Sequence, residues 1–178
     1  MRLLSSAAAS VFEVIFIINL LCFIIMFLLV AVDQLIKVVM QLWLFPDGIS
    51  KFIPGLVQFH YAENRGAAFG ILENARWVFI VLTVVVCTAA IVLMLAGKIK
   101  SGVVYTSLVF IVSGGIGNLI DRIFRGYVID FVEPTFMNFA IFNFADCLIT
   151  VGGAILIFYL LYDIFQDYKT HRELKGNA

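Results

Sequence analysis

Long apolar runs divide the chain into four segments, each long enough to cross a membrane as a helix. The runs cover residues 14–32, 77–97, 101–120 and 139–162, and about 20 helical residues span a hydrocarbon core of about 30 Å. Three of them contain no charged residue, and the fourth contains only Asp146. The pattern predicts an all-α membrane protein with four transmembrane helices in a single integral membrane domain, residues 1–178.

The segment 51–69 follows a different pattern. Pro54 and Gly55 indicate a turn, and apolar residues alternate with polar ones after it. We therefore expect a small extended or β element that lies on the outer membrane surface. The predicted fold also includes a short helix on that surface.

The composition supports a membrane protein and excludes other classes. Hydrophobic residues make up 63% of the chain and charged residues 13%, with a mean hydropathy of +1.07, far from the values of a soluble domain. The formal net charge is zero, so no nucleic-acid partner is indicated. The three cysteines are widely spaced in apolar sequence and predict neither a disulfide framework nor a zinc site.

The first run and the basic residues bear on topology. Arg2 precedes the first run, as in a secretory signal, but the run is longer than a signal's apolar region and lacks a small-residue cleavage site at its end. We expect it to be retained as a helix. Lys and Arg divide evenly between the two sides, yet Lys98 and Lys100 lie in a very short hairpin, where the positive-inside rule acts strongly. Both termini are therefore predicted to be cytoplasmic.

Two aspartates stand at the edges of apolar segments, each in a polar cluster. Asp130 lies in GYVIDF and Asp146 in FNFAD. An unpaired carboxylate near hydrocarbon costs at least about 2.5 kcal/mol, so its position calls for a functional reason. For Asp146 the alternative is a helix-capping role, because it lies near the predicted start of the fourth span.

Further polar residues have helical spacing close to the aspartates. Asn118 and Arg122 are four apart, and Asn143 and Asp146 are three apart, so each pair shares a helical face. Asp121 beside Arg122 could instead form a solvated surface pair. The glycines in Gly-Gly-Ile-Gly at 114–117 thin the third helix, for packing or for substrate.

Two other motifs leave structural and functional readings open. Asp33 and Lys37 are four apart and can pair, either as a helix-end ion pair with a snorkelling lysine or as substrate-binding groups. Asn64 and Gly66 combine an amide with a small residue, which suits close approach of a ligand but also an ordinary turn.

A transporter or ion pathway would also place polar residues in membrane helices, but it would need them through the midplane, whereas these gather towards one face. A nucleophilic protease would need Ser113 or Cys147. Ser113 lacks the glycine two positions earlier of a Gly-x-Ser-x-Gly elbow, and Cys147 has no histidine nearby in sequence. His60 and His171 are isolated, so no metal site is predicted.

Five sequence blocks together resemble the lipoprotein signal peptidase family, the type II signal peptidases of bacteria. They are DQLIK at 33–37, NRGAAF at 64–69, GGIGNLIDR at 114–122, GYVIDF at 126–131 and FNFAD at 142–146. The blocks occur in the family's order and cover nearly the whole chain except the termini. Ile36 departs from the serine that is common in the family at this position, which is not a catalytic one.

The resemblance implies an aspartic endopeptidase that cuts the signal peptide from diacylglyceryl-modified prolipoproteins, before the lipidated cysteine. It implies a catalytic dyad of Asp130 and Asp146 and no cofactor. The implied supporting and substrate-binding residues are Asn64, Gly66, Asn118, Arg122, Asn143, Asp33 and Lys37. Membrane lipids and cyclic peptide inhibitors of the globomycin type are implied partners. The implied location is the bacterial inner membrane, with the active site near the outer leaflet.

Overall fold

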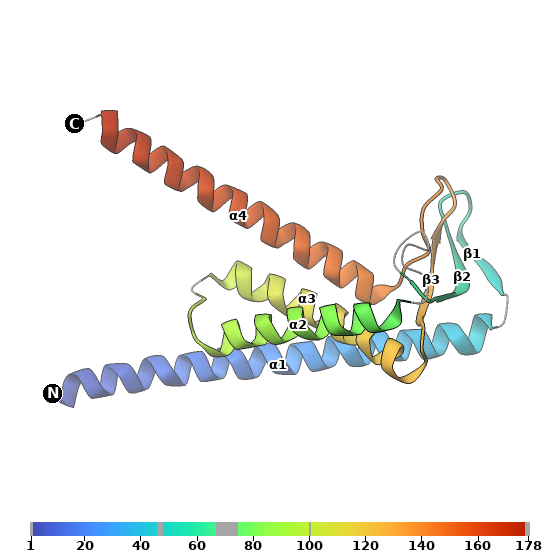
Figure 1. Cartoon of the computed structure of the whole chain (residues 1–178), viewed down its shortest axis with the longest axis horizontal. Helices are drawn as coiled ribbons and strands as arrows, with labels where there is room; N and C mark the ends of the chain where they lie inside the picture. Colours follow the sequence, from blue (N-terminus) through green and yellow to red (C-terminus); the bar gives the residue numbers. More distant parts are fainter. Residues whose placement is uncertain (1, 46–47, 67–74, 100, 177–178) are drawn as a thin grey trace.

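Four long helices form the body of the protein, and a small sheet lies at one end of them (Figure 1). The structure is a computed structural model that describes residues 2–45, 48–66, 75–99 and 101–176, with only the helical backbone for residues 2–12. The helices are α1 (Arg2–Leu44), α2 (Arg76–Leu95), α3 (Gly102–Phe124) and α4 (Phe144–Gly176). Each is long and apolar enough to cross a membrane, which confirms the predicted four-helix membrane fold.

The helices alternate in direction, so the start of α1, the α2–α3 connection and the end of α4 all lie away from the sheet (Figure 1). α3 is the central helix and packs against α1, α2 and α4. α4 diverges from the other three along its length (Figure 1). The α1–α2 and α3–α4 connections, which carry the strands of the sheet, therefore lie together at one end of the molecule (Figure 1).

Several helix ends differ from the predicted spans: α1 begins at Arg2, α3 ends at Phe124 and α4 ends at Gly176. α1 continues past Asp33 to Leu44, because the charges of Asp33 and Lys37 neutralise each other inside the protein and Pro46 is the first helix-breaking residue. α4 begins at Phe144 instead of residue 139. Residues 139–143 are extended, and Phe142 forms a bridge with Val132.

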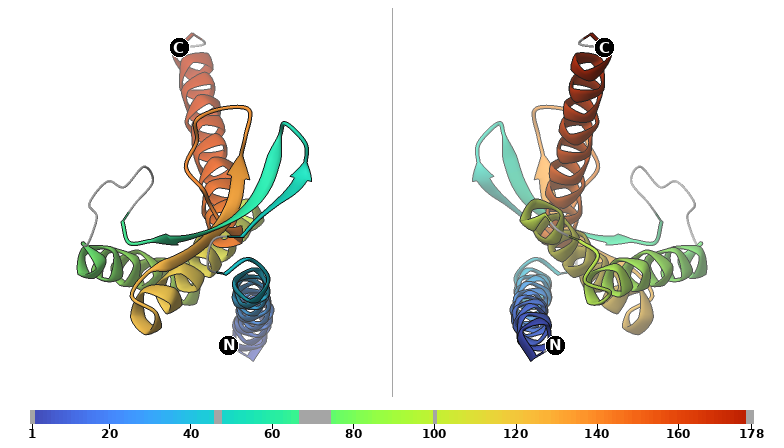
Figure 2. Two further views of the ribbon diagram at one scale, coloured as in Figure 1. Left: turned by 90° about the vertical axis from the view of Figure 1, so that its right-hand side faces the viewer. Right: turned by 90° about the vertical axis from the view of Figure 1, so that its left-hand side faces the viewer.

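The sheet has three antiparallel strands in the order β1 (Ile49–Ile53), β2 (Val57–Asn64) and β3 (Val128–Pro134). Its strands cross the ends of the helices when the molecule is viewed from that side (Figure 2). The β1–β2 hairpin confirms the extended element predicted for 51–69. The strand β3 was not predicted. No short helix occurs at residues 48–66 or 125–143, and residues 67–74 lie outside the described part.

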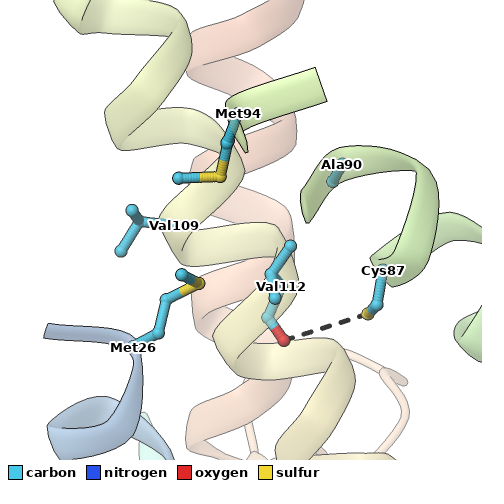
Figure 3. Packing of buried hydrophobic residues seen from close by; sticks show 6 residues of the cluster. All are labelled: Met26, Cys87, Ala90, Met94, Val109 and Val112. Atoms are coloured by element: carbon cyan, nitrogen blue, oxygen red, sulfur yellow. Dashed lines mark hydrogen bonds between the residues drawn. The ribbon is translucent and has the colours of Figure 1, made fainter. Parts of the chain in front are cut away.

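Apolar side chains and glycines pack the helices closely around α3. Met26 of α1, Cys87 of α2 and Val112 of α3 belong to one buried apolar cluster, in which the Cys87 thiol contacts the Val112 carbonyl oxygen at 4.0 Å (Figure 3). The glycines of α3 allow a closer approach: a Cβ atom on Gly114 would collide with the Ala145 carbonyl of α4, and one on Gly117 would lie 2.5 Å from Asp33 Oδ2. Because lipid gives little hydrophobic drive for helix association, such contacts hold the bundle together.

We expect Gly114→Ala to lower stability, because the new methyl group must push α4 away from α3. The cost should be about 1–3 kcal/mol, which is typical of overpacking. Gly153→Ala is the matched control, since a Cβ there meets nothing within 4 Å. Thermal unfolding in detergent should show a lower Tm for Gly114→Ala only, and equal Tm values for the two variants would contradict the close α3–α4 contact.

Candidate active site

Asp130 lies in the middle of β3 and is almost completely buried, with 2% of its surface exposed. Its two carboxyl oxygens accept hydrogen bonds from Asn143 Nδ2 at 2.6 Å and from Asn64 Nδ2 at 2.8 Å. Strand pairing sets Ala62 opposite Asp130 and Asn64 opposite Val128. The β2–β3 register therefore brings the Asn64 amide to the carboxyl group.

Asp146 lies in the first turn of α4 and forms a reciprocal cap with Asn143. The Asp146 N–H donates to Asn143 Oδ1 at 3.0 Å, and the Asn143 N–H donates to Asp146 Oδ2 at 3.1 Å. This is the capping-box arrangement, in which the cap residue and the third helical residue satisfy each other's backbone. Asn118 Nδ2 donates to the other oxygen, Oδ1, at 2.8 Å. Asp146 is thus both a helix cap and a member of a side-chain network.

Asn143 connects the two aspartates directly. It is fully buried, and it donates to Asp130 through its side chain and to Asp146 through its backbone. Its Nδ2 also donates to Asn118 Oδ1 at 3.1 Å. Every hydrogen-bonding group of this side chain is therefore engaged, which fixes the geometry of the pair Asp130 and Asp146, hereafter the aspartate pair.

Burial raises the pKa of Asp130 to about 7, and the nearby charge of Asp146 acts in the same direction. The hydrogen bonds from Asn64 and Asn143 and the charge of Lys37 oppose this shift, with smaller effects. Two carboxyl groups that influence each other in this way share a proton and titrate as a unit. Near neutral pH, the aspartate pair can therefore supply one acid and one base.

Arg122 lies beside the aspartate pair with little freedom to move. Its guanidinium donates to the Gly66 carbonyl at 3.2 Å and to the Asn118 carbonyl at 3.4 Å, and it stands 4.9 Å from the centre of the Phe79 ring. The Gly66 N–H donates to Asn64 Oδ1 at 2.9 Å. Asn64 and Gly66 thus form the turn that the sequence suggested, and they also contact the candidate site.

The interpretation of Asp121 and Arg122 as a solvated surface pair is wrong. Asp121 is fully buried, and it pairs with Lys37 at 2.8 Å and with Arg125 on the next turn of α3. The two side chains point to different partners because neighbouring helical positions do not share a face.

Asp33 and Lys37 form the predicted ion pair at 2.9 Å, but neither is solvated. The lysine does not snorkel, since its side chain has no exposed surface and its ammonium also donates to Asn118 Oδ1 at 2.9 Å. Asp33 Oδ1 accepts from the Ala145 N–H of α4 at 3.0 Å. These two residues support the aspartate pair from behind and do not line the cavity described next.

A cavity of about 660 Å³ opens beside the aspartate pair between α2, α3, α4 and the chain that precedes α4. Its polar wall includes Asp146, Asn118, Arg122 and Asn64. Its apolar wall includes Phe79, Ile149, Val151 and the segment 139–142. An apolar cavity with a few convergent polar groups at one end suits a lipid-like or peptide ligand that reacts at the polar end.

Neither nucleophile considered from the sequence has a histidine beside it. Cys147 lines the cavity, and none of the described residues that line it with Cys147 is a histidine. The Ser113 hydroxyl is buried and donates to the Val109 carbonyl of its own helix at 2.6 Å. His60 pairs with Glu133 on the sheet at 2.8 Å, and His171 is exposed near the end of α4. Within the described residues, no three His, Cys, Asp or Glu side chains are grouped so that they could hold a metal ion.

The sequence analysis missed Gln34 and Arg125, which belong to the polar cluster behind the aspartate pair. Gln34 donates to the Gly117 carbonyl at 3.1 Å and to Asp121 Oδ1 at 3.3 Å, while Arg125 donates to Gln34 Oε1 at 3.1 Å. Gln34 stands in the DQLIK block, next to Asp33, which was the only available signal. The β-branched run Val128–Val132 was the signal for β3.

The fold and site define a multi-pass membrane protein with a pair of carboxyl groups at one end of its helices, one buried and one half-buried beside a cavity. A family model described as signal peptidase (SPase) II matches residues 25–162. The chain belongs to this family of bacterial lipoprotein signal peptidases, and it is a multi-pass membrane peptidase.

Curated relatives and solved structures agree with this assignment. The chain is 46% identical over 134 residues to a lipoprotein signal peptidase of Streptococcus thermophilus, covering 74% of this chain and 86% of that one. It is 43% identical over 141 residues to one of Streptococcus pyogenes, covering 79% and 91%. A solved structure described as a bacterial membrane enzyme superposes with a TM-score of 0.76 at 27% identity, covering 80% of this chain and 88% of that one.

Proposed function

We propose that the protein is an aspartic endopeptidase that removes the signal peptide from diacylglyceryl-modified prolipoproteins, cutting before the lipidated cysteine. The observation that supports this most directly is Asn143, which holds the buried Asp130 and the cavity-lining Asp146 in one hydrogen-bonded unit. The family supplies the substrate class. The apolar cavity is suited to acyl chains and to the apolar signal segment, and also to cyclic lipopeptide inhibitors of the globomycin type.

In the proposed reaction Asp146 is the base and Asp130 the acid. Asp146 takes a proton from a water molecule as the water oxygen attacks the scissile carbonyl carbon, and Asp130 donates its proton to the carbonyl oxygen. The resulting tetrahedral diol collapses when the C–N bond breaks. Asp146 then passes its proton to the leaving amine, and a hydroxyl proton of the diol returns to Asp130.

Nearby donors support this reaction. The Arg122 guanidinium interacts electrostatically with both aspartates and reaches the cavity. It can therefore stabilise negative charge that develops on the carbonyl oxygen. Asn64 lines the cavity and covers Asp130, so its side chain must move aside for the substrate to reach the acid.

The proposal can be tested by incubating the purified protein in detergent with a diacylglyceryl-modified precursor. Mass spectrometry of the product should show a new N-terminus at the lipidated cysteine. An intact precursor, or a cut elsewhere in the chain, would overturn the proposed specificity.

The rate of cleavage should depend on pH through Asp130. Because its pKa is raised to about 7, the group keeps its proton below that pH and loses it above, which removes the proposed acid. We expect kcat/KM to fall as pH rises through about 7 and the aspartate pair becomes doubly ionised. A profile that stays flat from pH 6 to 9 would argue against Asp130 as the acid.

We further propose that both termini are cytoplasmic and that the aspartate pair lies near the outer leaflet of the inner membrane. In a variant without Cys22, Cys87 and Cys147, a cysteine at Thr135 beside the sheet should react with an impermeant thiol reagent in intact cells. A cysteine at Lys98 should react only after lysis. The reverse labelling pattern would invert the proposed topology.

A further inference from the structure

The side-chain amides of Asn64, Asn118 and Asn143 hold the aspartate pair. Among the described residues, Lys37 is the one cation that contacts any of these side chains. Its buried ammonium has three N–H donors, and it has three acceptors: Asp33 Oδ2 at 2.9 Å, Asp121 Oδ2 at 2.8 Å and Asn118 Oδ1 at 2.9 Å. Each donor is therefore used once. Only the third contact leads towards Asp146.

The Asn118 amide could in principle take either of two orientations, since its oxygen and nitrogen are nearly the same size. Its oxygen accepts from Lys37 Nζ and from Asn143 Nδ2, and its nitrogen donates to Asp146 Oδ1. In the opposite orientation, the N–H groups of the amide would face the N–H donors of Lys37 and Asn143, and its oxygen would face the Asp146 carboxylate. The Lys37 ammonium cannot accept a hydrogen bond. Its charge-assisted hydrogen bond to the Asn118 oxygen is stronger than the neutral one from Asn143.

Asn143 reaches its own orientation without Lys37. Its side-chain oxygen accepts the Asp146 backbone N–H, which can only donate, so its nitrogen must face Asp130 and Asn118. A backbone N–H thus orients Asn143. Asn118 is oriented by two donors to its oxygen, the Lys37 ammonium at 2.9 Å and the Asn143 amide at 3.1 Å, and the charged donor is the stronger.

We propose that Lys37 is a positioning residue for the aspartate pair: its ammonium orients the Asn118 amide so that Asn118 donates to Asp146 and keeps that carboxyl group as the ionised, water-activating member. The inference rests on the proposed function. Lys37 acts through Asn118 and does not touch the substrate, because it is fully buried and does not line the cavity.

The charges around Lys37 determine which variants can test this. Asp33 faces it from α1 and Asp121 from α3, and Arg125 neutralises Asp121 on its other side. Asp146 lies beyond Asn118 on α4, next to Arg122. On β3, Lys37 also counteracts the burial that raises the pKa of Asp130. Removing Lys37 alone would leave an unbalanced buried carboxylate.

The informative comparison is between Asp33→Asn and Asp33→Asn/Lys37→Met. The double variant keeps the buried cluster neutral, with Asp121 and Arg125 still paired. Asp33→Asn alone leaves one excess positive charge there, and the two chains differ by the Lys37 ammonium. Relative to Asp33→Asn, we expect kcat to fall about 10- to 100-fold, the loss of one hydrogen bond to a charged group. KM should change less than about twofold, because the cavity wall is untouched.

The pH profile separates positioning from a merely structural role. With the Asn118 N–H no longer directed at Asp146, the ionised form of the aspartate pair loses a hydrogen-bond donor. The acid limb of the plot of kcat against pH should therefore move to higher pH. Lys37→Arg in the otherwise unchanged chain should keep the acid limb in place, since a guanidinium also only donates. A shift in Lys37→Arg as large as in the double variant would overturn the inference.

A double-mutant cycle tests the route through Asn118. In an Asn118→Ala background, the added Lys37→Met change should lower kcat by less than about twofold, with Asp33→Asn present in both chains. An undiminished loss there, or an unchanged acid limb in Asp33→Asn/Lys37→Met, would refute the role of Lys37. Failure of the proposed function is distinct, because the unaltered protein would then not cut the lipidated precursor at all.

Discussion

Replacing Asp130 or Asp146 with asparagine should lower the rate of cleavage by about 10³-fold or more, because each change removes one of two groups that exchange protons with the reacting atoms. The substitution keeps the volume of the side chain. It also keeps an oxygen that can accept a hydrogen bond from Asn143. We therefore expect both variants to insert in the membrane and to fold, and single-turnover assays with the lipidated precursor to measure the loss.

Asp163→Asn is the matched control for these variants. It makes the same chemical change on α4 at an exposed position far from the cavity, and its rate should equal that of the unaltered protein. If a well-folded Asp130→Asn or Asp146→Asn variant kept substantial turnover, the aspartic mechanism would be excluded.

The second large effect is expected from the substrate. A precursor with an unmodified cysteine should be cut at least about 100-fold more slowly than its diacylglyceryl-modified form. Each buried methylene of an acyl chain contributes about 0.8 kcal/mol to membrane partitioning, so two chains hold the cysteine at a fixed depth. The apolar wall formed by Phe79, Ile149 and Val151 leads to the polar end of the cavity, where that depth places the scissile bond.

This comparison needs both precursors in the same micelles, because an unlipidated peptide could otherwise escape the enzyme by staying in water. A precursor that carries a single acyl chain should give an intermediate rate. Equal rates for all three would mean that the enzyme recognises the peptide alone, while cleavage by the aspartate pair would remain unaffected.

The sequence predicted the parts of this protein that depend on local spacing. The apolar runs predicted four helices. The four-residue separation of Asn118 and Arg122 predicted a shared face, and both residues line the cavity. The hairpin that contains β1 and β2 followed from its turn and its alternation. Each of these features is determined within a few residues of the chain.

Contacts between distant segments could not be predicted in this way. The Ala145 N–H meets Asp33 across 112 positions, and nothing local to either residue indicates the other. A snorkelling Lys37, one of the two interpretations left open, was wrong for the same reason, since its acceptors Asp121 and Asn118 come from α3. A buried lysine is tolerated only where such partners exist, and only the tertiary structure supplies them.

The reciprocal cap at the start of α4 ties assembly of the aspartate pair to the order of synthesis. Asp146 belongs to α4, and the first turn of this helix is held by Asp33 and Asn118 from helices made earlier. A nascent chain that has inserted only three helices therefore lacks half of the aspartate pair. The proposed catalytic pair is completed only when α4 docks, so a chain that has inserted only α1 to α3 lacks the proposed site.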